Sequence, residues 1–215
     1  MGNGMNKVLP GLYIGNFRDS KDKKQLEDNK ITHIVSAHDN AKSLLEGYKY
    51  HCINVADYPG QDLTPYFEES ALFIHKARCE EGNVLVHCLA GISRSTTLTI
   101  AYIMAVTDME WTEIFKSIKC SRSIADPNPG FKRQLNEFGK SEELKALKRK
   151  LKHDFDKASF DDENYLIKNM AETDPKLLQE YEEGIDVAAK YCNTAHENRT
   201  KPDSKPDDGF HGAGL

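Results

Sequence analysis

Residues 84–95 combine the residue types that phosphate chemistry needs. Residues 84–86 form a short apolar run, and a seven-residue loop then begins with Cys88, ends with Arg94 and leads into a helix. In such a loop the backbone N–H groups converge in front of the helix N-terminus, where the helix dipole favours an anion. Gly91 permits backbone angles that a larger residue resists, and Arg94 can donate two parallel hydrogen bonds to phosphoryl oxygens. The segment therefore predicts a phosphate-binding loop.

Cys88 stands at the mouth of this loop. The positive field that attracts a phosphate group also stabilises a thiolate, and the thiolate is the nucleophilic form of cysteine. The alternative is a small buried apolar residue, which is a common role of free cysteine. His87, Gly91 and Ser95 accompany Cys88 between a strand and a helix, and together they favour the nucleophile.

A mechanism through phosphocysteine also needs an acid that protonates the leaving alcohol or phenol. Asp57 and Asp62 both lie on the loop that leaves the strand expected at residues 50–55. If the strands are parallel, this loop lies at the same edge of the sheet as Cys88. Asp57 comes first after the strand and is the candidate acid. Asp62 is the alternative, although its place before the helix that opens at Thr64 suits a capping role.

Strands and helices alternate along residues 1–140. Apolar and β-branched runs predict an edge strand broken by a turn and three further strands, at residues 8–14, 31–36, 50–55 and 84–86. Helical spacing predicts helices from Asp19 or Ser20 to 29, from Thr64 to 81 and from Ser95 or Thr96 to 104, and over 111–118 and 128–138. This alternation is typical of α/β proteins. We expect a three-layer α/β sandwich in which helices flank a central, largely parallel sheet.

The charge of the chain is unevenly distributed. The 215 residues have a formal net charge of −5, yet residues 1–140 hold 17 basic and 17 acidic side chains. Residues 141–215 hold 12 and 17. The balanced first part argues against a nucleic-acid partner. We expect a catalytic domain over residues 1–140, a helical, charged C-terminal extension over 141–197 and a disordered polar tail over 198–215.

Targeting and ligand signals are few. The chain shows no secretory leader, and its longest near-apolar run, residues 98–106, is too short to span a bilayer. Five scattered cysteines predict reduced thiols, and the histidines lack partners at metal-ligand spacing, so we expect no metal. Gly2 becomes N-terminal once Met1 is removed, although Asn6 stands where the N-myristoylation pattern prefers Ser or Thr.

Residues 1–140 resemble the small atypical dual-specificity protein phosphatases, which belong to the cysteine-dependent class. The motif His-Cys-x5-Arg-Ser, here residues 87–95, is highly specific to that superfamily. Further matches are Asp57 with Leu63 and Tyr66-Phe67, residues 101–104, residues 127–131, and Gln134 with Leu135. Residues 1–15 look like the start of the myristoylated members of the family, which implies acylation of Gly2 despite Asn6. Residues after about 141 carry no such resemblance.

The resemblance assigns the steps of the reaction to four side chains. Cys88 would attack phosphorus and become phosphocysteine, while Arg94 would bind the phosphoryl group and stabilise the transition state. Asp57 would protonate the leaving group and then help to activate the hydrolytic water. Ser95 would hydrogen-bond the departing thiolate in the second step.

The resemblance also implies what surrounds these groups. His87 and Asn128 would shape the loop, and backbone N–H groups would hold the phosphoryl oxygens along Leu89, Ala90, Gly91, Ile92, Ser93 and Arg94. The loop has no lysine of the kind that phosphoinositide phosphatases carry, which favours phosphoprotein substrates, among them proteins of mitogen-activated protein kinase pathways. No cofactor is implied. We expect a cytoplasmic monomer held at the inner face of the plasma membrane through N-myristoyl Gly2.

Two other functions are alternatives to the phosphatase, and one surface feature has two interpretations. An RNA 5′-triphosphatase of the same superfamily would need a basic surface, and the neutral charge of residues 1–140 counts against it. A phosphoprotein-binding scaffold would be attractive if Cys88 or Arg94 were replaced. The basic residues from Lys145 to Lys152 are either a second membrane signal or, more commonly, a solvated helix face.

Overall fold

The computed structural model describes residues 4–155, 160–176 and 179–183. Five strands form one sheet in the order β1-β2-β5-β3-β4. They are β1 (Asn6–Leu9), β2 (Leu12–Gly15), β3 (Ile31–Ala37), β4 (Lys49–Ile53) and β5 (Asn83–His87). The β1–β2 pair is antiparallel, and the β2–β5, β5–β3 and β3–β4 pairs are parallel. The expected largely parallel sheet is confirmed.

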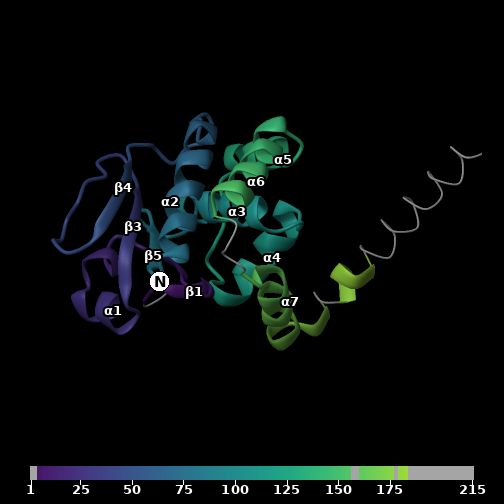
Figure 1. Ribbon diagram of the computed structural model, residues 1–215, viewed down its shortest axis with the longest axis horizontal. Helices are drawn as coiled ribbons and strands as arrows, with labels where there is room; N and C mark the ends of the chain where they lie inside the picture. The colour runs from purple at the N-terminus through teal and green to yellow at the C-terminus, as the bar shows by residue number, and fades with distance from the viewer. Residues whose placement is uncertain (1–3, 156–159, 177–178, 184–215) are drawn as a thin grey trace, which may run out of the picture.

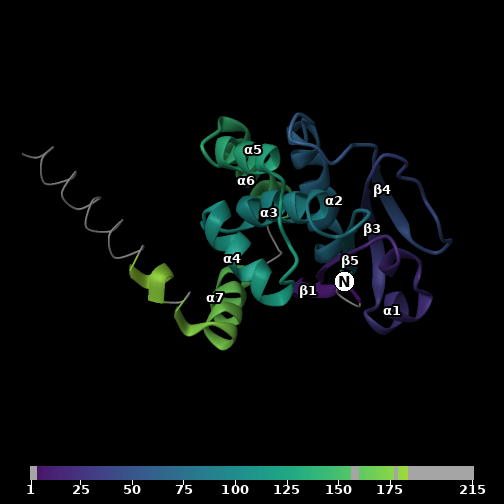
Figure 2. The same ribbon diagram turned by 180° about the vertical axis from the view of Figure 1, so that it is seen from behind.

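Helices cover both faces of this sheet because its central strands are apolar on both sides. Alternate residues of a strand point to opposite faces, and in β5 Val84 and Val86 join the larger core while Leu85 joins the smaller one. The smaller core includes Leu26 of α1 (Lys23–Asp28). On the other side lie α2 (Phe67–Cys79), α3 (Arg94–Val106), α4 (Trp111–Ser121), α5 (Pro129–Gly139), α6 (Glu142–Asp154) and α7 (Asp162–Thr173). Figures 1 and 2 show α1 on one side of the strands and α2 to α7 gathered on the other. The three-layer sandwich is confirmed.

The first predicted strand and helix are each divided in the structure. Residues 8–14 are not one broken edge strand but a hairpin of β1 and β2, which Gly11 turns with a φ of +77°. The first α-helix does not begin at Asp19 or Ser20, because those residues form a 3-10 turn, η1 (Asp19–Lys21). Asp22 caps α1 instead, and its side chain accepts a hydrogen bond from the Gln25 backbone.

Two later helix starts also differ from the prediction. Thr64 opens a short 3-10 helix, η2 (Thr64–Tyr66), and α2 follows it at Phe67. The third α-helix begins at Arg94, one residue before Ser95 and two before Thr96, the two expected starts. The last residue of the predicted phosphate-binding loop is therefore also the first residue of a helix whose side chains are almost all buried.

The helices after residue 140 pack onto the same core. Leu144, Leu147 and Leu151 of α6 are buried, as are Leu166 and Met170 of α7, and α7 contacts both α4 and β1. The predicted division into a catalytic domain and an extension stays a prediction, and the predicted tail over 198–215 lies outside the described residues. Over the part of the chain that the structure describes, no helix is long and apolar enough to cross a bilayer.

A buried ion pair joins α7 to α2. The Arg78 guanidinium donates two hydrogen bonds of 2.7 Å to the Asp162 carboxylate, and the two side chains are 1% and 3% exposed. Arg78 also donates to the Pro10 carbonyl at 3.0 Å and to the Tyr102 hydroxyl at 2.6 Å. The Phe160 ring centroid lies 4.1 Å from the guanidinium carbon. This cluster connects the beginning of α7 to the β1–β2 hairpin and to helices α2 and α3.

Replacing Asp162 by alanine is expected to lower the free energy of unfolding by about 3–5 kcal/mol. Removing one partner leaves the Arg78 charge buried without its counterion, and a lost buried partner costs about this much. Urea unfolding followed by circular dichroism measures the loss. Glu68→Gln is the matched control because it breaks the exposed Lys150–Glu68 pair, which should cost about 1 kcal/mol or less. Equal losses in the two variants would contradict the prediction.

Candidate active site

The sheet brings the loops with candidate residues to one edge. Strands β5, β3 and β4 are parallel neighbours, so the loops that follow them emerge side by side. Cys88 follows β5, Asp39 follows β3 and Asp57 follows β4. The N-terminus of α3 faces the same loop and adds its positive dipole end. Residues far apart in sequence thus surround the Cys88–Arg94 loop.

The Cys88 sulfur is enclosed by donors. Cys88 is 1% exposed. Its Sγ accepts a hydrogen bond from the Gly91 backbone N–H at 3.2 Å. The Ser95 hydroxyl lies 3.4 Å from Sγ, and either atom can donate. When Ser95 donates, two donors stabilise negative charge on sulfur. This arrangement suits a thiolate nucleophile.

Four consecutive carbonyls of the loop are bonded to groups outside it. Phe17 N–H donates to Leu89 O at 3.2 Å, and Asp126 N–H donates to Ile92 O at 2.9 Å. The Arg122 guanidinium binds the two carbonyls between them, Gly91 O at 2.7 Å and Ala90 O at 3.5 Å. In a trans peptide the N–H points opposite to the C=O, and the described residues contain no cis peptide bond. The N–H groups of residues 90–93 therefore point away from those partners, as an anion-binding nest requires.

Gly91 is required by both the direction of the chain and the space around it. Its φ is +68°, in the left-handed region that glycine enters without a steric penalty. A Cβ atom here would lie 2.5 Å from the Gly15 carbonyl oxygen and 2.5 Å from Arg122 Nη2. No other residue fits this position without moving the loop or the groups that hold it.

Arg94 is buried and only partly hydrogen-bonded. Its Nη1 donates to the Val55 carbonyl at 3.0 Å and to Asp39 Oδ2 at 3.1 Å. Nε has no hydrogen-bond acceptor among the described residues, although Asp57 Oδ2 lies 3.5 Å away. A buried donor without an acceptor is costly. A phosphoryl oxygen would satisfy this N–H and gain a charge-assisted hydrogen bond.

Asp57 and Asp62 have different surroundings. Asp57 Oδ1 accepts hydrogen bonds from the Ser93 hydroxyl at 2.8 Å and from the Asn128 amide at 2.9 Å, while Oδ2 faces Arg94. Asp62 Oδ1 instead accepts from the Thr64 backbone at 3.0 Å and the Thr64 hydroxyl at 2.7 Å. The structure therefore brings Asp57 to the phosphate-binding loop and places Asp62 at the start of η2.

The loop that carries Asp57 is held in place by α5. Asn128 caps that helix, because its side chain accepts from Phe131 N–H at 3.0 Å while its amide reaches Asp57. A Cβ on Gly130 would lie 2.0 Å from the Pro59 carbonyl oxygen, so only glycine allows the helix to approach the loop this closely. Gln134 then accepts from Leu63 N–H at 2.9 Å and donates to Gln61 O at 2.7 Å.

His87 is the last residue of β5, directly before the loop, and it is buried. Its Nδ1 is 3.2 Å from the Cys88 carbonyl oxygen, and burial lowers the pKa of its imidazole to about 4. Burial likewise lowers the pKa of His75 to about 4; this histidine lies between the Phe155 and Phe160 rings. Both imidazoles are therefore neutral at physiological pH.

These two histidines predict destabilisation by acid. An unfolded histidine titrates near pH 6.5, so between about pH 6.5 and 4 the unfolded chain binds protons that the folded chain excludes. The free energy of unfolding therefore falls as the pH is lowered through this window, by about 3 kcal/mol for each histidine. Urea titrations at pH 7, 6, 5 and 4.5 measure the slope.

Substitution of His87 separates its share of this slope. His87→Asn should reduce the pH dependence, whereas His153→Asn, at an exposed residue of α6, should leave it unchanged. A His87→Asn chain that keeps the full slope between pH 6.5 and 4 would contradict the assignment.

The structure adds three groups that the sequence did not suggest. Asp39 contacts Arg94, the Ser93 hydroxyl contacts Asp57, and Arg122 binds the loop carbonyls. Asp39 carried a usable signal, because it follows β3 as Asp57 follows β4. Gly2, the proposed acylation site, lies outside the described residues.

Three of the five basic residues from Lys145 to Lys152 pair with acidic side chains. Lys145 pairs with Glu142 at 2.7 Å, Lys148 with Asp108 at 2.9 Å, and Lys150 with Glu68 at 2.7 Å. Their charges are thus partly neutralised by neighbouring acids. This favours the solvated helix face over the second membrane signal.

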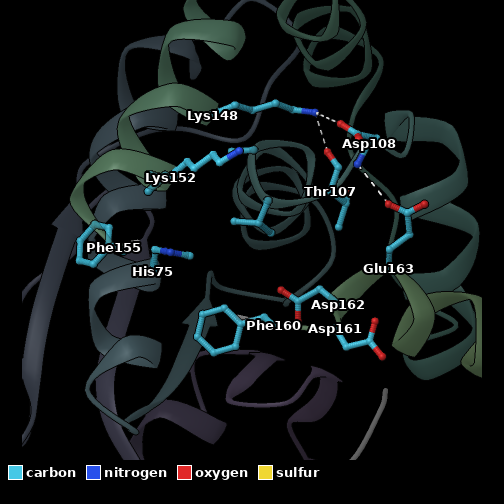
Figure 3. A pocket seen from close by; sticks show the side chains of 13 residues that line it. His75, Thr107, Asp108, Lys148, Lys152, Phe155, Phe160, Asp161, Asp162 and Glu163 are labelled. Atoms are coloured by element: carbon cyan, nitrogen blue, oxygen red, sulfur yellow. Dashed lines mark hydrogen bonds and ion pairs between the residues drawn. The ribbon is translucent and has the colours of Figure 1, made fainter. Parts of the chain in front are cut away.

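A separate cavity of about 560 Å³ lies between α2, α3, α6 and the beginning of α7. Figure 3 shows Lys148 and Lys152 along its upper edge, His75 beside Phe155, and Asp162 opposite them. None of the described residues that line it belongs to the Cys88–Arg94 loop. The cavity is therefore distinct from the candidate phosphate-binding site.

Comparisons with known proteins agree with this geometry. Residues 12–141 match the family model described as "Dual specificity phosphatase, catalytic domain". The chain is 59% identical over 142 residues to dual specificity protein phosphatase 22 of Homo sapiens, covering 66% of this chain and 77% of that protein. It is 53% identical over 166 residues to dual specificity protein phosphatase 15 of Mus musculus, covering 77% of this chain and 70% of that protein.

Solved structures show the same fold. The crystal structure of DUSP15 aligns with a TM-score of 0.68 and 51% identity, covering 71% of this chain and 97% of that chain. The crystal structure of a human tyrosine phosphatase-like serine/threonine/tyrosine-interacting protein aligns with a TM-score of 0.60 and 32% identity, covering 64% of this chain and 96% of that chain. Because a phosphatase-like protein shares the fold, the loop residues carry the argument for catalysis.

Proposed function

The chain belongs to the dual specificity phosphatase family, and from this we propose that Cys88, Arg94, Asp57 and Ser95 perform its reaction. The protein is thus a dual-specificity protein phosphatase. The observation that carries the assignment of residues is the loop itself. The carbonyls of residues 89–92 bond outward and the N–H groups of residues 90–93 face the other way, with Cys88 at one end of the loop and Arg94 at the other.

In the first step, the Cys88 thiolate attacks phosphorus and the P–O bond to the leaving group breaks. Arg94 and the N–H groups of residues 89–94 hold the three remaining phosphoryl oxygens as negative charge spreads over them. A proton on Asp57 Oδ2 passes to the leaving oxygen, while Oδ1 stays bonded to Ser93 and Asn128. The products are a free alcohol or phenol and phosphocysteine.

In the second step, a water molecule attacks the phosphocysteine and the P–S bond breaks. The Asp57 carboxylate accepts a proton from this water. Ser95, 3.4 Å from Sγ, donates a hydrogen bond to the departing thiolate. Inorganic phosphate leaves, and Cys88 and the proton on Asp57 are restored for the next cycle.

Apolar side chains beside the site favour a polypeptide substrate. Tyr58 is 54% exposed and Leu89 is 49% exposed, and among the described residues they are the large hydrophobic side chains most open to solvent. Tyr58 follows Asp57 and Leu89 follows Cys88, so a bound substrate would meet both. The choice among phosphoproteins, including those of mitogen-activated protein kinase pathways, and the monomeric state stay predictions.

Turnover of defined substrates tests this function. We expect the purified chain to hydrolyse an aryl phosphate and phosphotyrosine and phosphothreonine peptides in the presence of a chelator, and to release little phosphate from 5′-triphosphate RNA. A phosphocysteine trapped by acid quenching should map to Cys88. Phosphate binding without any trapped intermediate would support the scaffold instead, and preferred cleavage of the RNA would support the triphosphatase.

We also propose that Gly2 is N-myristoylated and places the protein at the cytoplasmic face of the plasma membrane. The support is the position of Gly2 in the sequence. Because three of the four lysines of α6 pair with neighbouring acids, the acyl chain would act largely alone. A single myristoyl chain gives only marginal, reversible membrane binding, with an association constant of about 10⁴ M⁻¹.

Intact mass and vesicle binding test the acylation. Chain expressed in a eukaryotic host should lose Met1 and gain a C14 acyl group, and it should sediment weakly with phosphatidylcholine vesicles. Gly2→Ala should abolish both the mass gain and the sedimentation. Asn3→Ala is the neighbouring control and should keep them. An unmodified wild-type mass would refute the proposal.

A further inference from the structure

The Arg122 guanidinium lies between the phosphate-binding loop and residues 4–6, which we call the N-terminal segment. The residue is the C-cap that follows α4 and is 2% exposed. Toward the loop, Nε donates to Gly91 O at 2.7 Å and Nη2 donates to Ala90 O at 3.5 Å. Toward the N-terminal segment, Nη1 donates to Asn6 Oδ1 at 2.6 Å and to Gly4 O at 3.3 Å. One buried side chain therefore spans two segments of the chain.

The contacts on the loop side set the direction of two peptide groups. A guanidinium is planar, and its N–H groups have fixed relative directions. Because it holds the carbonyls of Ala90 and Gly91, the N–H groups of Gly91 and Ile92 must point the opposite way. The first of these is the donor to Cys88 Sγ. Arg122 thus orients N–H groups that stabilise the nucleophile and line the phosphate-binding loop, while its own hydrogen bonds go to oxygens of Gly91, Ala90, Gly4 and Asn6.

The contacts on the N-terminal side set the direction of the guanidinium. Asn6 lies in β1 opposite Ile14 of β2, so its backbone is fixed by the sheet. Met5 N–H donates to Gln25 Oε1 at 3.1 Å, and Gly4 adopts a φ of +105°, which turns the chain toward Arg122. With Nη1 held by Asn6, rotation of the guanidinium would break the bonds to Gly91 and Asn6 together.

We propose that Arg122 is a positioning residue that makes the phosphate-binding loop depend on the N-terminal segment, with Asn6 as its orienting partner. The proposal rests on the proposed phosphatase function of the loop. It assigns to residues 4–6 an effect on phosphate binding and turnover that passes through their hydrogen bonds to Arg122. Loss of the Asn6 side chain should therefore weaken catalysis through Arg122 and by no other route.

A double-mutant cycle tests this dependence in the full chain. Arg122→Met, which keeps a long side chain without donors, should lower kcat/KM for an aryl phosphate by about 10²-fold, since a misplacement of about 1 Å at a catalytic site costs this much. Asn6→Ala should lower it by about tenfold, the scale of one hydrogen bond to a charged group. In the double variant, Asn6→Ala should add almost nothing, because its effect passes through Arg122.

Matched variants separate positioning from a general loss of stability. Asn6→Asp keeps an acceptor oxygen and should retain nearly full activity, and Lys7→Ala, at the exposed neighbour on β1, should be silent. Inorganic phosphate should bind more weakly to Arg122→Met at a temperature where circular dichroism shows it folded. Additive effects of the two substitutions, or unchanged phosphate binding, would overturn the proposal. If Arg122→Met does not fold, equal activities of Asn6→Ala and Lys7→Ala would overturn it.

Calorimetry of inorganic phosphate keeps this test separate from the proposed function. A wild-type chain that binds phosphate but hydrolyses no ester would contradict the proposed function. Weaker phosphate binding by Asn6→Ala than by Lys7→Ala would still support the role of Arg122. An active wild-type enzyme whose phosphate affinity is the same in Asn6→Ala and Lys7→Ala would leave the function intact and reject the coupling.

Discussion

Replacing Cys88 by serine is expected to lower kcat for an aryl phosphate by about 10⁴-fold or more, the scale on which removal of an enzymatic nucleophile acts. The hydroxyl stays neutral where the thiolate would carry the attacking charge. The described residues place Gly91 N–H and the Ser95 hydroxyl at the sulfur, but no basic side chain there accepts a proton from a serine. The phosphate-binding loop should keep its conformation after the change, because its peptide groups are held by Phe17, Arg122 and Asp126. Steady-state kinetics measures the loss.

Phosphate affinity and a second cysteine provide the controls. Cys88→Ser should still bind inorganic phosphate with an affinity close to that of the wild type, because it keeps Arg94 and the loop N–H groups. Cys79→Ser, at a partly buried cysteine of α2, should retain wild-type turnover. Substantial activity in Cys88→Ser, or an equal loss in Cys79→Ser, would contradict the role of Cys88.

The fold was predictable where local patterns and topology agreed. The apolar run at residues 84–86 and the loop after it became β5 and the Cys88 loop, because a strand buried on both faces needs no alternation of polar residues. Helix starts were less predictable, since several polar residues in a row can each act as a cap. The Asp22 side chain accepts the hydrogen bond from Gln25 N–H and so caps α1. Asp19 and Ser20 lie in the preceding 3-10 turn.

The site was predictable where its residues follow strands directly. Asp57 could be placed beside Cys88 because the carboxyl ends of parallel strands meet at one edge. Its preference over Asp62 agrees with the observed contacts, since Asp62 bonds to Thr64. The same reasoning applied to the strand at residues 31–37 would have found Asp39.

Contacts between distant segments were beyond such reasoning. Arg122 is 31 residues from Gly91 and 116 from Asn6, and Arg78 is 84 residues from Asp162. Neither arginine lies in a pattern that separates it from an exposed helical residue. Packing decides their environments, because a buried guanidinium needs several acceptors that only the assembled fold supplies.

Replacing Asp57 by asparagine should lower kcat by about 10²–10⁴-fold for a substrate with a poor leaving group, the range that general acid catalysis supplies. Asparagine can still accept the hydrogen bonds from Ser93 and Asn128, so the loop should keep its shape. What it lacks is an acidic proton, because an amide nitrogen replaces Oδ2. Phenyl phosphate, whose leaving group must be protonated as the bond breaks, measures the full effect.

The leaving group separates acid catalysis from a structural loss. The leaving group of a nitrophenyl or other activated phosphate departs as a stable anion, so Asp57→Asn should cost much less with such a substrate than with phenyl phosphate. Asp62→Asn removes a carboxylate five residues away and should behave like the wild type with both substrates, because Asp62 bonds to Thr64 rather than to the loop. An equal loss of kcat on the two substrates would indicate that the substitution distorts the phosphate-binding loop. A leaving-group-dependent loss in Asp62→Asn, with Asp57→Asn active, would transfer the acid role to Asp62.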